Sequence, residues 1–219
     1  MIKKIYRFFH RQFSKPDERG EYSAGRWQDM VRVKVLELCK EARGSLIDIG
    51  CGEGLFLAKL ARANKDLKIF GIDIWDKILD KARARLLKEG FSNIELKIMD
   101  IAKMDFQDDF FDTLVCINVF FNLDEKTFLK SLNELTRICR KGGRIIFDIR
   151  NKSNILLWFK YKLARYYDQT VKNLPLKTYS LKKASLLFKN KGFKINKVIP
   201  IGFPKGRFSP IFVIEAVKS

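Results

Sequence analysis

The 219-residue sequence predicts an α/β protein, built as one domain around a doubly wound, mostly parallel sheet of seven strands. Three observations predict this class. Short apolar segments alternate with longer amphipathic ones, which is typical of βαβ units. A glycine-rich turn follows the first apolar segment, at 50–54. The last two β-like segments are joined only by "FPKGRFS", which is too short for a parallel crossover, so the sheet should end in an antiparallel pair.

Each element is predicted from apolar periodicity and from the residues at its ends. Gly90 is expected to end one helix, and the pair Gly142–Gly143 another. Ser180 is expected to cap the N-terminus of the last helix. The predicted helices are 26–42, 54–64, 76–90, 124–143 and 180–193, and the predicted strands are 45–50, 67–74, 94–100, 111–119, 144–151, 194–202 and 210–218.

The composition is that of a folded protein in a reducing compartment. Hydrophobic residues make up 47% and charged residues 32% of the chain. No apolar run reaches the roughly 18 residues of a membrane span, and the N-terminus lacks the apolar core of a secretory signal. Four dispersed cysteines and one histidine predict reduced thiols in the cytoplasm and no metal site.

The net charge of +19 is distributed unevenly. Residues 151–219 hold 15 of the 44 basic side chains but only 2 of the 25 acidic ones. A basic surface of this kind favours an anionic partner, although it can also serve solubility alone. We divide the chain into a basic amphipathic N-terminal segment (1–25) and one domain (26–219), with a basic helical insertion or lid (151–192) between the fifth and sixth strands.

The glycine turn "DIGCGEG" indicates a ligand at the end of the first strand, because glycine allows positive φ and close approach of a ligand. Its spacing is one residue shorter than the dinucleotide fingerprint G-x-G-x-x-G, and no G-K-[ST] of a P-loop follows. Asp48 and Glu53 would repel a phosphate and would favour a cationic ligand.

The stretch "LIDIGCGEG" resembles the first motif of the class I S-adenosylmethionine-dependent methyltransferases. The resemblance continues through "IFGIDI", "MDI", "FDTLVCINVF" and "RICRKGGRIIF" to the C-terminus. It implies a Rossmann-like methyltransferase fold with S-adenosylmethionine as cofactor. The implied contacts are Gly50, Gly52 and Gly54 near the methionyl part, Asp48 near the ammonium, Asp73 on the ribose hydroxyls, Asp100 on the adenine amino group, Ile74 and Ile101 beside the adenine ring, and Asn118 beside the methionyl side.

Several of these residues also have a purely structural interpretation. Cys51 is interpreted as a small residue that fills the turn within the cofactor site, not as a nucleophile. Asp100 could be a turn residue and Asn118 a strand-end cap. Asp148 and Arg150 end the fifth strand near the expected acceptor position, or they pair with each other. No catalytic base is predicted.

The methyl acceptor is predicted as a small hydrophobic or anionic molecule, such as a quinone, a lipid or a lipid-linked sugar intermediate. The segment "NVFF" (118–121) lacks the prolines typical of base-amino methyltransferases, yet an RNA methyltransferase remains the alternative. A catalytically inactive binding subunit of the same fold is the second alternative. The basic, aromatic-rich segments 1–13 and 154–167 suit peripheral association with an anionic inner membrane surface. The sequence does not indicate an oligomeric state.

Overall fold

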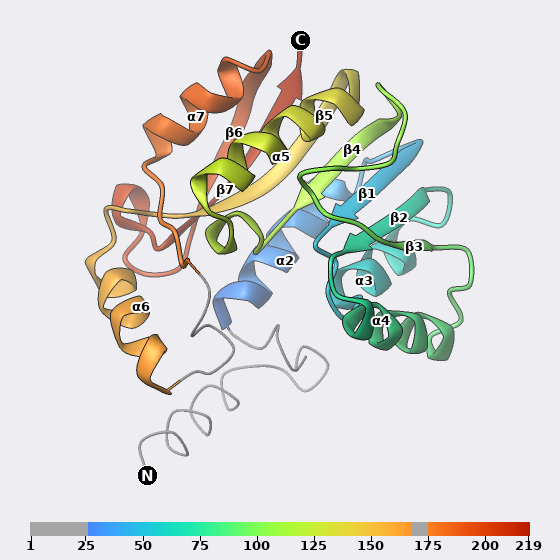
Figure 1. Cartoon of the computed structure of the whole chain (residues 1–219), viewed down its shortest axis with the longest axis horizontal. Coiled ribbons are helices and arrows are strands. Elements are labelled where there is room, and N and C mark those ends of the chain that lie inside the picture. The colour runs from blue at the N-terminus through green and yellow to red at the C-terminus, as the bar shows by residue number, and fades with distance from the viewer. Residues whose placement is uncertain (1–25, 168–174) are drawn as a thin grey trace.

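A computed structural model describes residues 26–167 and 175–219, which surround a single seven-stranded sheet (Figure 1). The predicted amphipathic segment 1–25 lies outside these residues. In chain order the elements are α2 (Arg26–Cys39), β1 (Ser45–Ile49), α3 (Leu55–Ala63), β2 (Lys68–Asp73), α4 (Asp76–Lys88), β3 (Glu95–Ile98), β4 (Phe111–Cys116), η2 (Phe120–Asn122), α5 (Glu125–Ile138), β5 (Cys139–Arg150), α6 (Ile155–Tyr167), α7 (Leu181–Lys189), β6 (Phe193–Ile201), η4 (Gly206–Phe208) and β7 (Ile211–Lys218).

The strand order is β3-β2-β1-β4-β5-β7-β6. Strands β1 to β5 pair in parallel, whereas β7 lies between β5 and β6 and is antiparallel to both. The predicted parallel sheet with a C-terminal antiparallel pair is therefore confirmed. The order reverses between β1 and β4, and ligands of open α/β sheets bind at the carboxyl ends of the strands at such a point.

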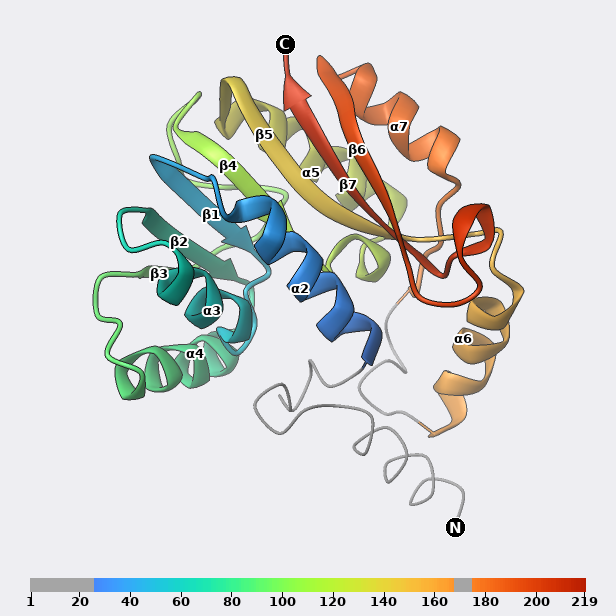
Figure 2. The same cartoon turned by 180° about the vertical axis from the view of Figure 1, so that it is seen from behind.

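Both faces of the sheet are covered by helices (Figures 1 and 2). Alternate residues of β1 point to opposite faces: Ile47 and Ile49 join one core and Leu46 the other. Helices α5 and α7 pack on the first face, and α2, α3 and α4 on the second. This two-sided burial explains why the central strands read as continuous apolar runs.

The helices predicted over 26–42 and 180–193 end earlier, at Cys39 and Lys189, and the largest boundary error concerns α5. The helix predicted over 124–143 ends at Ile138, and β5 begins at Cys139 instead of residue 144. The glycine pair lies inside the strand, where the β4–β5 register shifts. A Cβ at Gly143 would lie 2.8 Å from the Arg140 carbonyl oxygen, so this pair permits a bulge and does not end the helix.

Two other signals at helix ends are confirmed. Ser180 caps α7, since its Oγ accepts the Lys183 N–H at 3.2 Å. Gly90, with φ of 81°, follows the end of α4. Helices α6 and α7 both lie between β5 and β6, in the predicted basic insertion. The four cysteines are buried free thiols, and no helix among the described residues is long and apolar enough to cross a membrane.

Candidate cofactor and acceptor site

The glycine turn joins β1 to α3 and is held against the end of β2. The N–H groups of Gly50 and Cys51 both donate to the Ile72 carbonyl, at 2.8 and 2.9 Å. Gly50 has φ of 74°, and a Cβ there would lie 2.4 Å from Val119 Cγ2. A side chain at this position would therefore both strain the backbone and collide with the segment that follows β4.

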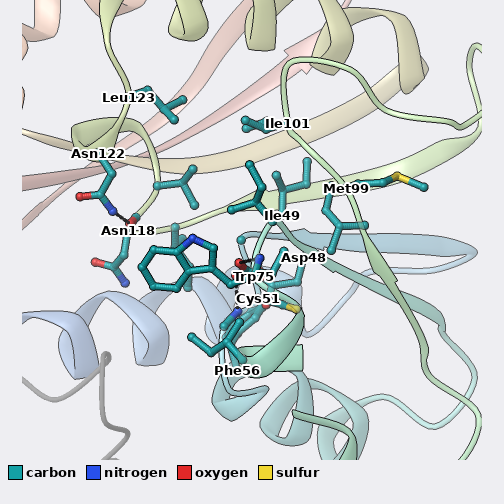
Figure 3. Close-up of a pocket in the computed structure, with 18 of the residues that line it drawn as sticks. Asp48, Ile49, Cys51, Phe56, Trp75, Met99, Ile101, Asn118, Asn122 and Leu123 are labelled. Carbon is teal, nitrogen blue, oxygen red and sulfur yellow. Dashed lines mark hydrogen bonds between the residues drawn. The ribbon is translucent and has the colours of Figure 1, made fainter. Parts of the chain in front are cut away.

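A cavity of about 570 Å³ opens above this turn, at the carboxyl ends of β1, β2 and β4 (Figure 3). Nine of the ten predicted site residues line it: Asp48, Gly50, Cys51, Gly52, Asp73, Ile74, Asp100, Ile101 and Asn118. Gly54 does not. Its α-carbon faces α4, where an added Cβ would lie 3.2 Å from Ala82 Cβ, so the structure gives Gly54 a helix-packing position.

Asp48 is a buried acid at the floor of the cavity. Its side chain is 1% exposed, and its Oδ1 has no hydrogen-bond partner among the described residues. Burial, reinforced by the negative charge of Asp73 and opposed by Arg32, raises the pKa of Asp48 to about 8. A buried carboxyl group with an unused oxygen is suited to a ligand that donates hydrogen bonds or carries positive charge.

This raised pKa predicts a pH dependence of stability. The unfolded pKa of aspartate is about 3.9, so between roughly pH 4 and 8 the folded chain holds one more proton at Asp48 than the unfolded chain. The stabilising contribution of the protonated Asp48 is complete below pH 4 and is lost as the pH rises toward 8. Relative to Asp48→Asn, the unaltered chain should lose up to about 1.4 kcal/mol of unfolding free energy per pH unit. Urea unfolding at pH 5, 6 and 7 measures this, and parallel curves for the two proteins would contradict it.

Asp73 links the ends of the first two strands. Its Oδ2 accepts the Gly52 N–H at 3.0 Å, and its Oδ1 accepts the Trp75 N–H at 3.1 Å. The carboxylate is only partly buried and faces the cavity. Each oxygen has one donor within residues 26–167 and 175–219, which leaves acceptor capacity on both for a pair of ligand hydroxyls.

Aromatic and aliphatic side chains also line the cavity, and two of them directly follow Asp73. Ile74 and Trp75 line the cavity but are 59% and 52% exposed, so a ligand there would cover apolar surface. Ile101 is buried, and the neighbouring Asp100 accepts the Ala102 N–H at 2.8 Å within a turn. Both interpretations of Asp100 thus stand, because it makes a turn and also lines the cavity. Trp75 was not predicted, although an aromatic residue two positions after the strand-end acid was a signal for it.

Asn118 lies at the end of the cavity beyond β4 and adopts φ of 61°. Its backbone N–H donates to Asp148 Oδ1 at 2.5 Å, and its Oδ1 accepts from Arg150 Nη2 at 2.6 Å. A guanidinium can only donate. The amide is therefore oriented with Nδ2 as the group that Asn118 can present to a ligand.

Asp148 and Arg150 form a buried ion pair behind Asn118, with Nη1 and Oδ2 2.9 Å apart. Burial raises the pKa of Asp148 even though Arg150 opposes this shift. Neither residue lines the cavity, so the pairing interpretation is the one that the structure shows. The Arg150 guanidinium also lies 4.5 Å from the ring centre of Phe121, which does line the cavity and which the sequence did not single out.

Comparison with known proteins agrees with this architecture. A family model described as a methyltransferase domain matches residues 40–193. Phosphatidylethanolamine N-methyltransferase from Cereibacter sphaeroides is 28% identical over 127 residues, covering 58% of this chain and 60% of that protein. A tRNA (guanine-N(7)-)-methyltransferase from Streptococcus agalactiae serotype III is 26% identical over 212 residues, covering 86% and 90%. The crystal structure of magnesium protoporphyrin IX methyltransferase from Synechocystis PCC 6803 with bound SAH has a TM-score of 0.70 at 19% identity, covering 99% and 100%.

A seven-stranded sheet of this order, with an acidic glycine turn at its switch point, defines a Rossmann-like methyltransferase. The chain belongs to the class I S-adenosylmethionine-dependent methyltransferase family, and S-adenosylmethionine is its cofactor. The residues present fit that group. The cofactor carries an ammonium, a sulfonium and two ribose hydroxyls. The cavity offers the carboxylate of Asp73 and the Oδ1 of Asp48, which has no partner in the described part of the chain.

Proposed function

We propose that this chain methylates a small acceptor of hydrophobic or anionic character, such as a quinone, a lipid or a lipid-linked sugar intermediate. The observation that carries the proposal is the lining of the cavity beyond Asn118. Val119, Phe121 and Leu123 supply apolar surface there, while Asn122 Oδ1 is buried without a partner among the described residues. An apolar body with one polar group matches such a pocket.

The cofactor residues have distinct roles in this proposal. Asp48 holds the ammonium, and Asp73 accepts hydrogen bonds from the ribose hydroxyls. Asp100 holds the adenine amino group, with Ile74 and Ile101 beside the ring. Gly50, Gly52 and Cys51 bring the backbone of the turn close to the methionyl part, and Asn118 faces it from the segment that follows β4. Bound S-adenosylmethionine supplies a methyl group that is already activated on its sulfonium.

The chain's own residues then contribute mainly positioning and exclusion of water. Phe121 and Leu123 would enclose the acceptor, and Asn118 Nδ2 would donate to an acceptor oxygen. Arg150 would keep the Asn118 amide in this orientation through its 2.6 Å bond to Oδ1. Such a pocket selects by shape and by one or two hydrogen bonds.

An RNA methyltransferase is the second candidate, because the tRNA-methylating relative is aligned over most of both chains. The basic residues after position 150 would then contact phosphates. A binding subunit without activity is disfavoured, because the acidic side chains that would hold the cofactor all line the cavity.

Methyl-labelled S-adenosylmethionine and extracts of the source cells test the proposal. We expect label in the lipid or small-molecule fraction with the unaltered chain, and at least tenfold less with Asp73→Ala at a subsaturating cofactor concentration. Label confined to RNA would establish the second candidate instead. If the chain binds S-adenosylhomocysteine but labels no fraction, the binding-subunit interpretation replaces both.

A further inference from the structure

Helix α6 exposes large apolar side chains to solvent. Leu157 is 1% exposed and Tyr161 is half-buried, so these two residues lie on the inward face. Ile155, Trp158 and Phe159, at spacing i, i+3 and i+4, are 67%, 54% and 50% exposed. Most of the exposed α6 side chains that the structure describes are therefore apolar, which is unusual for a surface helix.

The loop between β6 and β7 extends this apolar surface. Phe203 and Phe208 of the loop are 79% and 45% exposed. The loop is fastened to the start of α6, because Asn154 Nδ2 donates to the Phe208 carbonyl at 2.6 Å. Asn151 Nδ2 likewise donates to the Arg207 and Ser209 carbonyls, at 2.9 and 2.8 Å. Figure 2 shows η4 of this loop beside the first turn of α6.

We call this surface the α6 patch. Its apolar members are Ile155, Leu156, Trp158, Phe159, Phe203 and Phe208, and its exposed basic members are Lys152, Lys162, Lys205 and Arg207. Lys162 Nζ lies 5.0 Å from the Trp158 ring centre, and the Arg207 guanidinium lies 4.6 Å from that of Phe208. The sequence has no acidic residue over 149–167 or 194–214, so the two segments that form the patch carry only positive charge.

We propose that the α6 patch docks the protein onto the surface of an anionic lipid bilayer. Aromatic and aliphatic side chains would enter the boundary between headgroups and acyl chains, and the lysines and Arg207 would meet anionic headgroups. The aliphatic members favour lipid over nucleic acid. Ile155 and Leu156 have no aromatic face for stacking on bases and no hydrogen-bonding group, whereas burial in hydrocarbon stabilises them.

The docking surface lies next to the cavity. Tyr161, on the inward face of α6, stacks on Phe121 with ring centres 6.4 Å apart and planes at 21°. Phe121 lines the end of the cavity where we place the acceptor. Helix α6 therefore lies between the two sites. Its outward side carries the α6 patch, and its inward side contacts that end of the cavity. The docking proposal itself does not depend on the identity of the acceptor.

Sedimentation of the full chain with vesicles tests the proposal. We use phosphatidylcholine vesicles with and without phosphatidylglycerol, and we expect binding only to the anionic ones. Trp158→Ser/Phe159→Ser should weaken that binding at least tenfold, and Lys205→Glu/Arg207→Glu should weaken it and reduce its salt dependence. Leu87→Ser is the matched control, because Leu87 is 72% exposed on α4, on the other side of the molecule. This variant should bind vesicles as the unaltered chain does.

The same variants decide between lipid and other partners. Each must retain the unaltered affinity for S-adenosylhomocysteine, which shows that it is folded. Vesicle binding that survives Trp158→Ser/Phe159→Ser would overturn the proposal, because the attraction would then reside elsewhere in the chain. Absence of vesicle binding by the unaltered chain would also overturn it. RNA binding that these substitutions abolish, in a chain that does not bind vesicles, would overturn it in favour of a nucleic-acid partner.

Discussion

Replacing Arg150 by methionine is expected to lower the free energy of unfolding by about 3–5 kcal/mol. Arg150 and Asp148 form an ion pair whose side chains are 5% and 1% exposed. Removal of the guanidinium leaves the Asp148 carboxylate buried without its counter-ion, and leaves Asn118 Oδ1 without its donor. Both losses act on the same buried cluster, which is why the effect should be large.

Urea unfolding of three variants measures this effect and its origin. Asp148→Asn/Arg150→Met should recover part of the loss, because no charge remains buried and the new amide oxygen can still accept the Asn118 N–H. Asp148→Asn alone should also destabilise the chain, since it leaves Arg150 unpaired. A loss below about 1 kcal/mol for Arg150→Met would show that the ion pair contributes little to stability.

Replacing Asp73 by alanine is expected to weaken S-adenosylhomocysteine binding at least tenfold. We propose that this carboxylate accepts a hydrogen bond from each ribose hydroxyl, and hydrogen bonds to a charged group contribute roughly 1.5–3 kcal/mol each. The substitution also removes the acceptor of the Gly52 N–H at the glycine turn, so the turn itself should loosen. Calorimetric titration of both proteins measures the affinity ratio.

Two further variants separate ribose recognition from a general loss of structure. Asp73→Asn keeps one acceptor oxygen and should show an intermediate affinity. Asp76→Ala removes an acid three residues later, at the exposed start of α4 and outside the cavity lining, and should bind normally. Unchanged affinity of a folded Asp73→Ala would show that Asp73 is not the ribose ligand.

The fold was predictable because its signals are local. Alternating apolar segments indicated the parallel sheet, and the short 203–209 connection indicated the antiparallel end. The boundary at Ile138 was not predictable, because glycines after a helical pattern resemble a helix stop. Only the packing of Gly143 against the Arg140 and Asp112 carbonyls shows that they serve a bulge in β5.

The candidate site was predictable where its residues belong to the carboxyl ends of β1, β2 and β3 or to the turns that follow them. Asp48, Asp73 and Asp100 all line the cavity because parallel strands bring their carboxyl ends to one edge. Phe121 and the inward position of Arg150 depend on how η2 and α6 pack, and no sequence pattern reports this. Gly54 was assigned to the cofactor from its motif, although its surroundings place it against α4.

Calorimetric titration of the unaltered chain with S-adenosylhomocysteine and, separately, with NAD tests the central claim most directly. That claim is that the acidic glycine turn and Asp73 form a site for a phosphate-free nucleoside cofactor that carries an ammonium group. We predict a single site with micromolar affinity for S-adenosylhomocysteine and no measurable heat with NAD. Binding of NAD without binding of S-adenosylhomocysteine would contradict the account.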